Sequence, residues 1–176
     1  MKNKYKYKTT EKRTAIHEAG HAVMAFFLEI PIREMSIIPY EDDSGITYGK
    51  IVNKLPKGFE SISYEDRYHK LAEKYIMVLM SGHIAEKIFL KRLKFRSESD
   101  DRSIMNLITY IIGYDPKINT AYIKYLELVV KAKLNHFKRK PIIKNLAEIL
   151  IGRKEIKGNE CKKVISDLIQ NEIKKR

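Results

Sequence analysis

The chain has 176 residues, 44% of them hydrophobic, and a net charge of +13. This length suits one domain with a sizeable core, so the sequence predicts a single domain over residues 1–176. A lone cysteine, Cys161, excludes a disulfide framework within the chain and favours a reducing, cytoplasmic location. The longest apolar runs, such as residues 75–80, fall far short of the roughly 20 residues that cross a bilayer, so no membrane span is expected.

The first predicted element is a helix over residues 10–29. Thr9 or Thr10 can cap its start, and apolar residues recur at helical spacing from Ala15 to Phe27. Pro31 stops it. Two runs rich in β-branched residues follow, at 34–38 and 46–52. Between them lies an acidic turn that contains Ser44 and Gly45, so the two runs predict a strand pair, and residues 56–63 then predict a loop.

The rest of the chain predicts helices. A long helix is expected over residues 64–90 and a shorter one over 100–112, which Ser99 can cap. Three more are expected at 117–138, 141–151 and 159–174, with the segment "GRKEIKG" linking the last two. The predicted fold class is therefore mainly α (α+β), with one small β-hairpin or sheet and a C-terminal helical bundle.

Positive charge is concentrated in the last third of the chain. Residues 116–176 hold 16 of the 35 Lys and Arg but only 6 of the 22 Asp and Glu. Basic helices usually present a solvated face, but segments 131–144 and 159–176 are also candidates for binding nucleic acid. There is no zinc-finger cysteine pattern, RNP-type aromatic motif or Gly-rich phosphate loop beside them. The candidate catalytic and metal-binding residues all lie in the first part of the chain, residues 1–115.

The segment "TAIHEAGHAVMAFF" contains the pattern HExxH within the first helix. His17 and His21 are four residues apart and project from one helix face, close enough to bind one Zn²⁺. Glu18 lies beside them, where it can accept a proton from an attacking water and pass it to the leaving amine. Gly20 costs about 1 kcal/mol of helix propensity relative to alanine, which suggests that something packs closely there. The alternative is an ordinary helix with two histidines.

A zinc site needs a third protein ligand. The residues after His21 read "AVMAFFLEI", which excludes a third histidine of the HExxHxxGxxH kind. A carboxylate from elsewhere must serve. Glu86, Asp100 and Asp101 are the candidates, and spacing does not choose between them. The simpler role of the two aspartates is to stabilise the start of their helix.

The order of these motifs resembles the peptidase domain of the FtsH-type ATP-dependent zinc metalloproteases. The similar segments are "TAIHEAGHAVMAFFL", "REMSIIPYEDDSGITYGKI", "YIMVLMSGHIAEKIF", "SESDDRSIMNLI" and "NLAEILIGRKEIKGNECKKVI". Ser81 and His83 stand where that family has glycine and arginine, and the "SES" segment lacks the family's glycine. The resemblance implies a helical, zincin-like metallopeptidase domain.

The resemblance implies His17, His21 and Asp101 as zinc ligands and Glu18 as the catalytic base. Glu86 would support the site and is the reserve ligand. The strand around Ile46 and Lys50 would be the edge to which an extended substrate polypeptide adds. The family carries a membrane anchor and an ATPase, whereas this sequence has no Walker A motif.

The leading hypothesis is a stand-alone zinc metalloendopeptidase for unfolded or loosely folded polypeptides, with a separate ATPase or further copies of the chain as partners. The alternatives are a catalytically silent binding or regulatory subunit and a basic nucleic-acid-binding protein.

Overall fold

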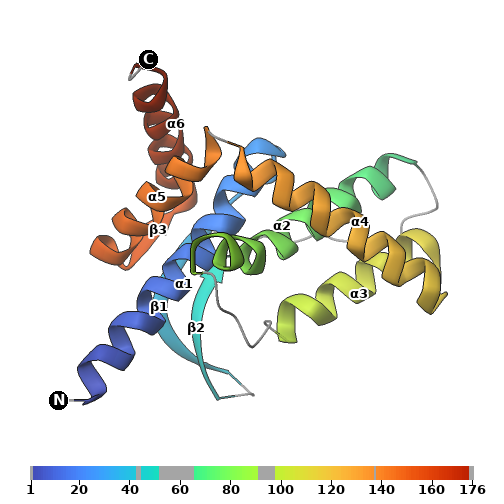
Figure 1. Ribbon diagram of the computed structural model, residues 1–176, viewed down its shortest axis with the longest axis horizontal. Helices are drawn as coiled ribbons and strands as arrows, with labels where there is room; N and C mark the ends of the chain where they lie inside the picture. The colour runs from blue at the N-terminus through green and yellow to red at the C-terminus, as the bar shows by residue number, and fades with distance from the viewer. Residues whose placement is uncertain (1, 43–44, 52–65, 91–97, 137, 175–176) are drawn as a thin grey trace.

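A computed structural model describes residues 2–42, 45–51, 66–90, 98–136 and 138–174 (Figure 1). The predicted acidic turn at 43–44, the loop at 56–63 and the start of the helix at 64 lie outside the described residues. Side chains are described for residues 10–39, 69–90, 100–136 and 138–174. The predicted caps at Thr9 and Ser99 therefore also lie outside.

The described residues form a mainly helical fold with one small sheet, as predicted. In chain order the elements are α1 (Lys2–Phe27), β1 (Glu34–Asp42), β2 (Gly45–Ile51), α2 (Asp66–Leu90), α3 (Glu98–Ile112), α4 (Pro116–Asn135), α5 (Arg139–Arg153), β3 (Glu155–Lys157) and α6 (Gly158–Lys174). Both α1 and α3 begin earlier than predicted. None of the described helices is both long enough and apolar enough to cross a membrane.

The predicted strand pair is confirmed. β1 pairs antiparallel with β2, and a register shift between Ser36 and Pro39 marks an irregularity in the ladder. The prediction that "GRKEIKG" is only a linker is wrong, because β3 lies within it and pairs antiparallel with β1 through Met35 and Ile156. The strand order is β2-β1-β3. A strand of three residues has too short a pattern to be recognised, and its partner lies more than 100 residues away.

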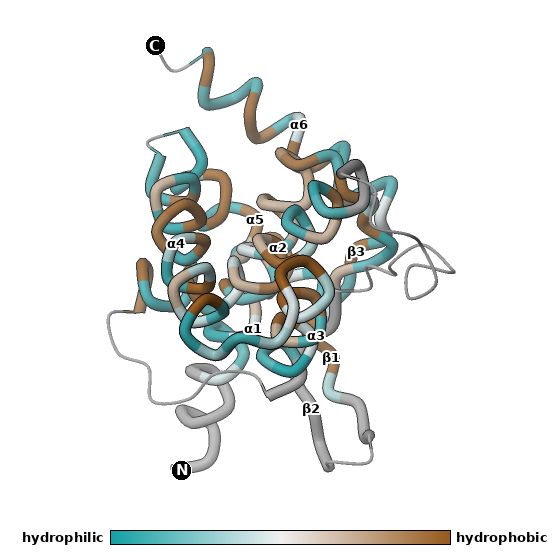
Figure 2. Tube along the Cα trace, turned by 90° about the vertical axis from the view of Figure 1, so that its right-hand side faces the viewer, coloured by the Kyte–Doolittle hydropathy of each residue, from teal (hydrophilic) through white to brown (hydrophobic). Residues whose placement is uncertain are grey.

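The second half of helix α1 lies at the centre of the molecule, and α1 contacts α2, α5 and the sheet (Figure 1). Its buried face is built from small residues, among them Ala15, Ala19 and Ala22, which are fully buried. Helix α4 covers α2, and α6 packs on α5. In Figure 2 the hydrophobic segments gather where these helices face one another, whereas α6 alternates between hydrophobic and hydrophilic residues.

Hydrogen bonds of the backbone and of one side chain define two of the helix ends. After α1, Glu29 takes a positive φ of 61° and the Ile30 N–H donates to the Ala25 carbonyl, so the chain turns before Pro31. The Asp115 carboxylate caps α4 by accepting from the N–H groups of Lys117 and Ile118, at 2.9 and 3.1 Å. That cap sets the start of α4 at Pro116, one residue before the predicted start.

Gly158 joins the C-terminal helices to the sheet. Its N–H donates to the Arg33 carbonyl at 2.7 Å, and a Cβ at this position would lie 1.8 Å from the Ile32 carbonyl oxygen. A side chain therefore does not fit unless the backbone of one segment moves. Gly152, near the end of α5, is exposed and has nothing within 4 Å of an added Cβ.

These two glycines give a matched test of the fold. We expect Gly158→Ala to lower the free energy of unfolding by about 1–3 kcal/mol, because it forces a clash between backbones. Gly152→Ala should raise it by about 0.5–1 kcal/mol through helix propensity. Urea denaturation followed by circular dichroism measures both. Equal stability of the two variants would contradict the packing described here.

Candidate metal centre

The two histidines of the HExxH pattern meet at their Nε2 atoms. His17 and His21 lie on successive turns of α1, with ring centroids 4.5 Å apart and planes inclined by 80°. The distance between the two Nε2 atoms is 2.9 Å. The spacing of four residues therefore brings both rings to one point, as the sequence predicted.

Each histidine is oriented through its other ring nitrogen. His17 Nδ1 lies 2.6 Å from Oε1 of Glu86, and His21 Nδ1 lies 2.6 Å from the Val78 carbonyl oxygen. Both partners are acceptors, so each Nδ1 carries the hydrogen and each Nε2 of a neutral ring presents a lone pair. The Arg13 Nε–H donates to Oε2 of Glu86 at 2.5 Å and holds that carboxylate in place.

A carboxylate from α3 completes the group. Oδ2 of Asp100 lies 3.3 Å from His17 Nε2 and 3.7 Å from His21 Nε2. Among the described residues, His17, His21 and Asp100 are the group of metal-binding side chains that could hold one ion. Donor atoms around a tetrahedral Zn²⁺ are separated by about 3.4 Å when the bonds are about 2.1 Å long. The three observed separations bracket that value.

The lack of a side chain at Gly82 leaves space beside the Nε2 atoms of the two histidines. A Cβ on Gly82 would lie 2.4 Å from His21 Nε2 and 2.7 Å from His17 Nε2. The backbone of α2 therefore passes directly beside the two lone pairs, and only glycine permits this approach. The nature of the donors, their spacing and this space all fit a zinc ion.

The charges around the histidines also favour a cation. Burial by itself would lower the pKa of His17, but hydrogen bonds to Asp100 and Glu86 raise it to about 10. Burial would raise the pKa of Asp100, yet the hydrogen bonds from the two histidines hold it well below its usual range. The pKa of Glu86 is also lowered, against the effect of burial, by His17 and Arg13. The group therefore holds positive charge between ionised carboxylates, and a bound metal would take the place of the proton.

Glu18 lies on α1 between the two histidines in sequence. It is only 4% exposed, and its Oε2 atom has no hydrogen-bond partner. Burial raises the pKa of its carboxyl group to about 7, although the neighbouring histidines lower it. A buried carboxylate with an unused oxygen suits a group that exchanges a proton with a substrate or water.

The adjacent residues Asp100 and Asp101 lie in different surroundings. Asp100 lies at the histidines, whereas Asp101 lines a pocket between α2, α3 and α4. The assignment of Asp101 as third ligand stays a prediction, and the geometry favours Asp100. The pattern of apolar residues in α3 also favours Asp100 over Asp101. Ile104, Leu107 and Ile108 are buried at four, seven and eight residues after Asp100, which puts Asp100 on the inward face of α3.

Glu86, the reserve ligand, lies on the far side of the His17 ring from the other donors. It contacts Nδ1 rather than Nε2, so its position suits a residue that orients the ligand. The roles of Val78 and Gly82 could not be predicted from the sequence. Val78 acts through its carbonyl oxygen and Gly82 through the lack of a side chain. Neither contribution leaves a pattern in a single sequence.

The other predicted binding regions can also be placed. β2, which contains Ile46 and Lys50, lies at an edge of the described sheet, so substrate addition there stays a prediction. In the basic part, the Arg139 guanidinium lies 4.4 Å from the centre of the Phe27 ring, and Lys154 pairs with Glu11. Some of its positive charge therefore serves packing against α1. Nucleic-acid binding stays a prediction.

Comparison with known proteins agrees with this geometry. Residues 5–114 match the family described as Peptidase family M41. The chain belongs to this family. The match includes all of α1 except its first three residues, together with β1, β2, α2 and α3 and all the side chains of the candidate centre, and it ends just before α4.

Several relatives carry the name ATP-dependent zinc metalloprotease FtsH. FtsH 4 of Sorangium cellulosum is 36% identical over 104 residues, which are 55% of this chain and 14% of that protein. The protein of Magnetococcus marinus is 34% identical over 106 residues, 57% of this chain and 14% of that protein. The protein of Marinobacter nauticus is 29% identical over 109 residues, 60% of this chain and 16% of that protein. The matched region thus spans about a sixth or less of these relatives.

The space beside Gly82 gives a direct test of the metal centre. We expect Gly82→Ala to weaken zinc binding at least tenfold, because its methyl group would lie where the two Nε2 atoms converge. Titration with Zn²⁺ or Co²⁺ measures the affinity, and circular dichroism checks that the helices are retained. Gly152→Ala is the control. Unchanged affinity in a folded Gly82→Ala variant would show that the ion lies elsewhere.

Proposed function

We propose that this member of peptidase family M41 is a zinc-dependent metalloendopeptidase that hydrolyses peptide bonds of unfolded or loosely folded polypeptides. One observation carries the proposal. Two histidine Nε2 atoms and a carboxylate oxygen converge on one point, beside a buried glutamate whose Oε2 has no hydrogen-bond partner. Membership of a peptidase family and the name of the relatives support it.

In this proposal His17, His21 and Asp100 hold the zinc ion. Bound zinc supplies Lewis-acid activation of a carbonyl group and of water. Glu86 keeps the His17 ring in the tautomer that leaves Nε2 free, and the Val78 carbonyl does the same for His21. Arg13 in turn keeps Glu86 ionised and fixed.

Glu18 is the proton carrier of the proposed reaction. Its carboxylate accepts the proton of the attacking water at the oxygen that has no partner in the structure, and then gives this proton to the leaving nitrogen. A carboxyl group whose pKa is raised to about 7 can both accept and release a proton near neutral pH. Glutamine at this position would retain the shape but could not accept the proton.

The substrate class follows from the sheet and the relatives. β2 at the sheet edge could pair with an extended polypeptide through main-chain hydrogen bonds, which favours unfolded chains over a particular sequence. The relatives are named ATP-dependent, so we propose that an ATPase takes part in substrate delivery and that further copies of the chain associate for it.

A catalytically silent binding or regulatory subunit is the second candidate. Residues 116–174 lie outside the family match and carry most of the excess positive charge, which suits a contact with an acidic partner. A zinc-loaded chain that cleaves no unfolded polypeptide would favour this candidate.

The third ligand can be identified by substitution. We expect Asp100→Ala to reduce bound zinc well below one equivalent, because it removes a donor from the convergence point. Asp101→Ala is the matched control at the adjacent position and should retain zinc. Glu86→Gln should bind zinc about 10–100-fold more weakly without abolishing it. Metal analysis after dialysis measures all three. Zinc loss in Asp101→Ala but not in Asp100→Ala would overturn the assignment.

The base can be tested separately from the metal. Glu18→Gln should retain one equivalent of zinc and lose cleavage of unfolded casein by at least about 100-fold, because general-base catalysis typically contributes that much. Glu148→Gln, which changes an exposed glutamate on α5, should cleave at the wild-type rate. Cleavage by Glu18→Gln at the wild-type rate would exclude Glu18 as the base.

A further inference from the structure

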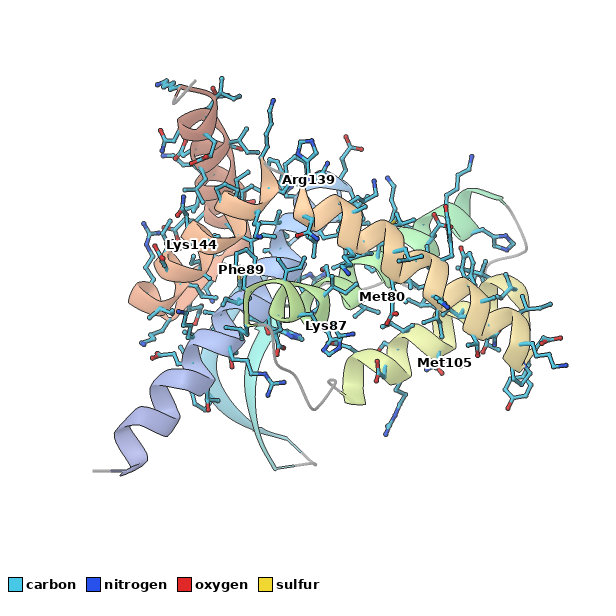
Figure 3. All side chains as sticks on the ribbon, in the orientation of Figure 1. Met80, Lys87, Phe89, Met105, Arg139 and Lys144 are labelled. Atoms are coloured by element: carbon cyan, nitrogen blue, oxygen red, sulfur yellow. The ribbon has the colours of Figure 1, made fainter. Side chains whose placement is uncertain are left out.

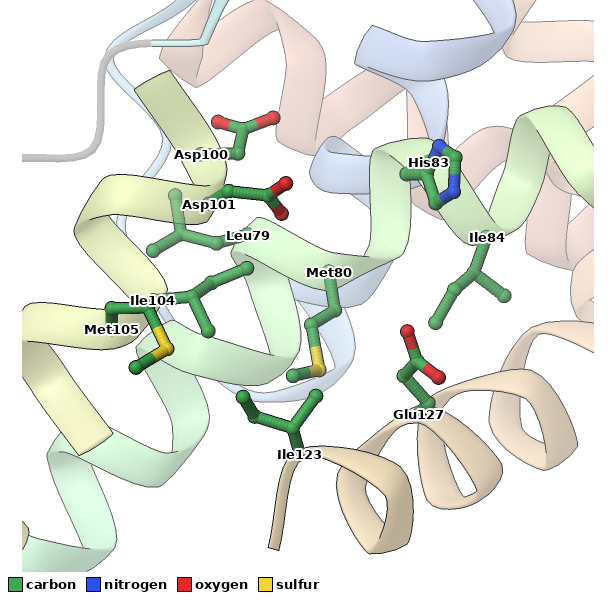
Figure 4. Close-up of a pocket in the computed structure, with 10 residues that line it drawn as sticks. All are labelled: Leu79, Met80, His83, Ile84, Asp100, Asp101, Ile104, Met105, Ile123 and Glu127. Atoms are coloured by element: carbon green, nitrogen blue, oxygen red, sulfur yellow. The ribbon is translucent and has the colours of Figure 1, made fainter. Parts of the chain in front are cut away.

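A pocket opens beside the candidate metal centre, between α2, α3 and α4 (Figure 4). Its volume is about 230 Å³, and Asp100 forms part of its wall. The pocket therefore shares a residue with the point where the histidines converge. Met105, on the α3 side, is 40% exposed, so the pocket can be reached from solvent.

The size and the wall suit one long side chain. Sites for whole small molecules usually measure about 300–1,000 Å³, so this pocket is too small for most cofactors. Met80, Ile104, Met105 and Ile123 form much of its apolar surface, and Figure 3 shows Met80 on α2 and Met105 on α3. Methionine side chains adapt to the shape of a partner, and an aliphatic stem would gain from contact with all four residues.

The charge of the wall selects among long side chains. The carboxyl groups of Asp101 and Glu127 point into the space from α3 and α4 (Figure 4). None of the described residues that line the pocket is Lys or Arg. His83 is the basic group there. The side chains that line the pocket thus include more acidic groups, Asp101 and Glu127, than basic ones, without counting Asp100.

We propose that this pocket receives a lysine or arginine side chain of the substrate, at a position next to the scissile bond. The aliphatic stem lies against the apolar wall, and the cationic head lies at Asp101 and Glu127. This inference rests on the proposed peptidase function and adds a preference to it. Main-chain pairing at the sheet edge accepts any sequence, and the pocket then favours cleavage beside a basic residue.

Cleavage of a peptide series tests the preference. The series keeps one sequence and places Arg, Lys, Met, Leu or Asp at each position around the cleaved bond, which mass spectrometry identifies. We expect kcat/KM for the Arg or Lys peptide to exceed that for Met about fivefold at one flanking position, and Asp to be the poorest. Equal rates for Arg and Met at every position, or a preference for Leu, would overturn the proposal.

Glu127 allows the pocket to be tested apart from the metal. It lies on α4, and Glu127→Gln should lower kcat/KM for the Arg peptide more than for the Met peptide, so that the ratio of Arg to Met cleavage falls towards one. Glu148→Gln, an exposed glutamate outside the pocket, should leave the ratio unchanged. An unchanged ratio in Glu127→Gln would contradict the assigned role of Glu127.

A binding measurement separates this inference from the peptidase proposal. The Glu18→Gln chain, labelled with ¹³C at the methionine methyl groups, is titrated with the Arg and the Met peptide. The Met80 and Met105 signals, assigned by Met→Leu substitution, should shift at a lower concentration of the Arg peptide. A wild-type chain that cleaves nothing would refute the peptidase proposal alone, whereas signals that respond to neither peptide, or to both equally, would refute the pocket assignment.

Discussion

The Nε2 atoms of His17 and His21 lie in direct contact, and this contact is stable only when a positive charge lies between the two rings. His17 and His21 each donate a hydrogen through Nδ1, to Glu86 and to the Val78 carbonyl, and their Nε2 atoms then face each other at 2.9 Å. Neutral rings in this arrangement repel, so a proton or a cation must lie between them. The nearby carboxylate of Asp100 stabilises either one. A site built in this way has a strong preference for a positive ion.

Close packing of α1 against α2 makes this arrangement available. A Cβ on Gly20 would lie 2.7 Å from both the Ala85 Cβ and the Ser81 carbonyl oxygen, so the two helices meet at distances that only small residues permit. The close packing expected at Gly20 from its cost in helix propensity is thereby confirmed. Because the helices are so close, the Val78 carbonyl and the Glu86 side chain of α2 reach the histidine rings of α1. The C-terminal part supports the same helix from another side, through α5 and through contacts such as the Arg139 guanidinium over Phe27.

Features that depend on residues close together in the sequence could be predicted, whereas contacts between distant segments could not. The HExxH pattern is local, so helical geometry alone places His17 and His21 on one face. The choice between Asp100 and Asp101 depends on a rotation of about 100° around α3, and only the apolar stripe that follows Asp100 indicates it. β3, Val78 and Gly82 could not be predicted, because each acts through a backbone contact with a segment far away in sequence. A single sequence carries no pattern for such contacts.

The location of a bound ion tests the central claim most directly. Crystals of the zinc-loaded chain, measured at the zinc absorption edge, would give an anomalous difference map that locates the metal without assumptions about its ligands. We expect one peak beside Gly82, within about 2.0–2.2 Å of His17 Nε2, His21 Nε2 and an Asp100 carboxylate oxygen. A peak coordinated by Asp101 or Glu86 in place of Asp100, or no peak at the two histidines, would contradict it.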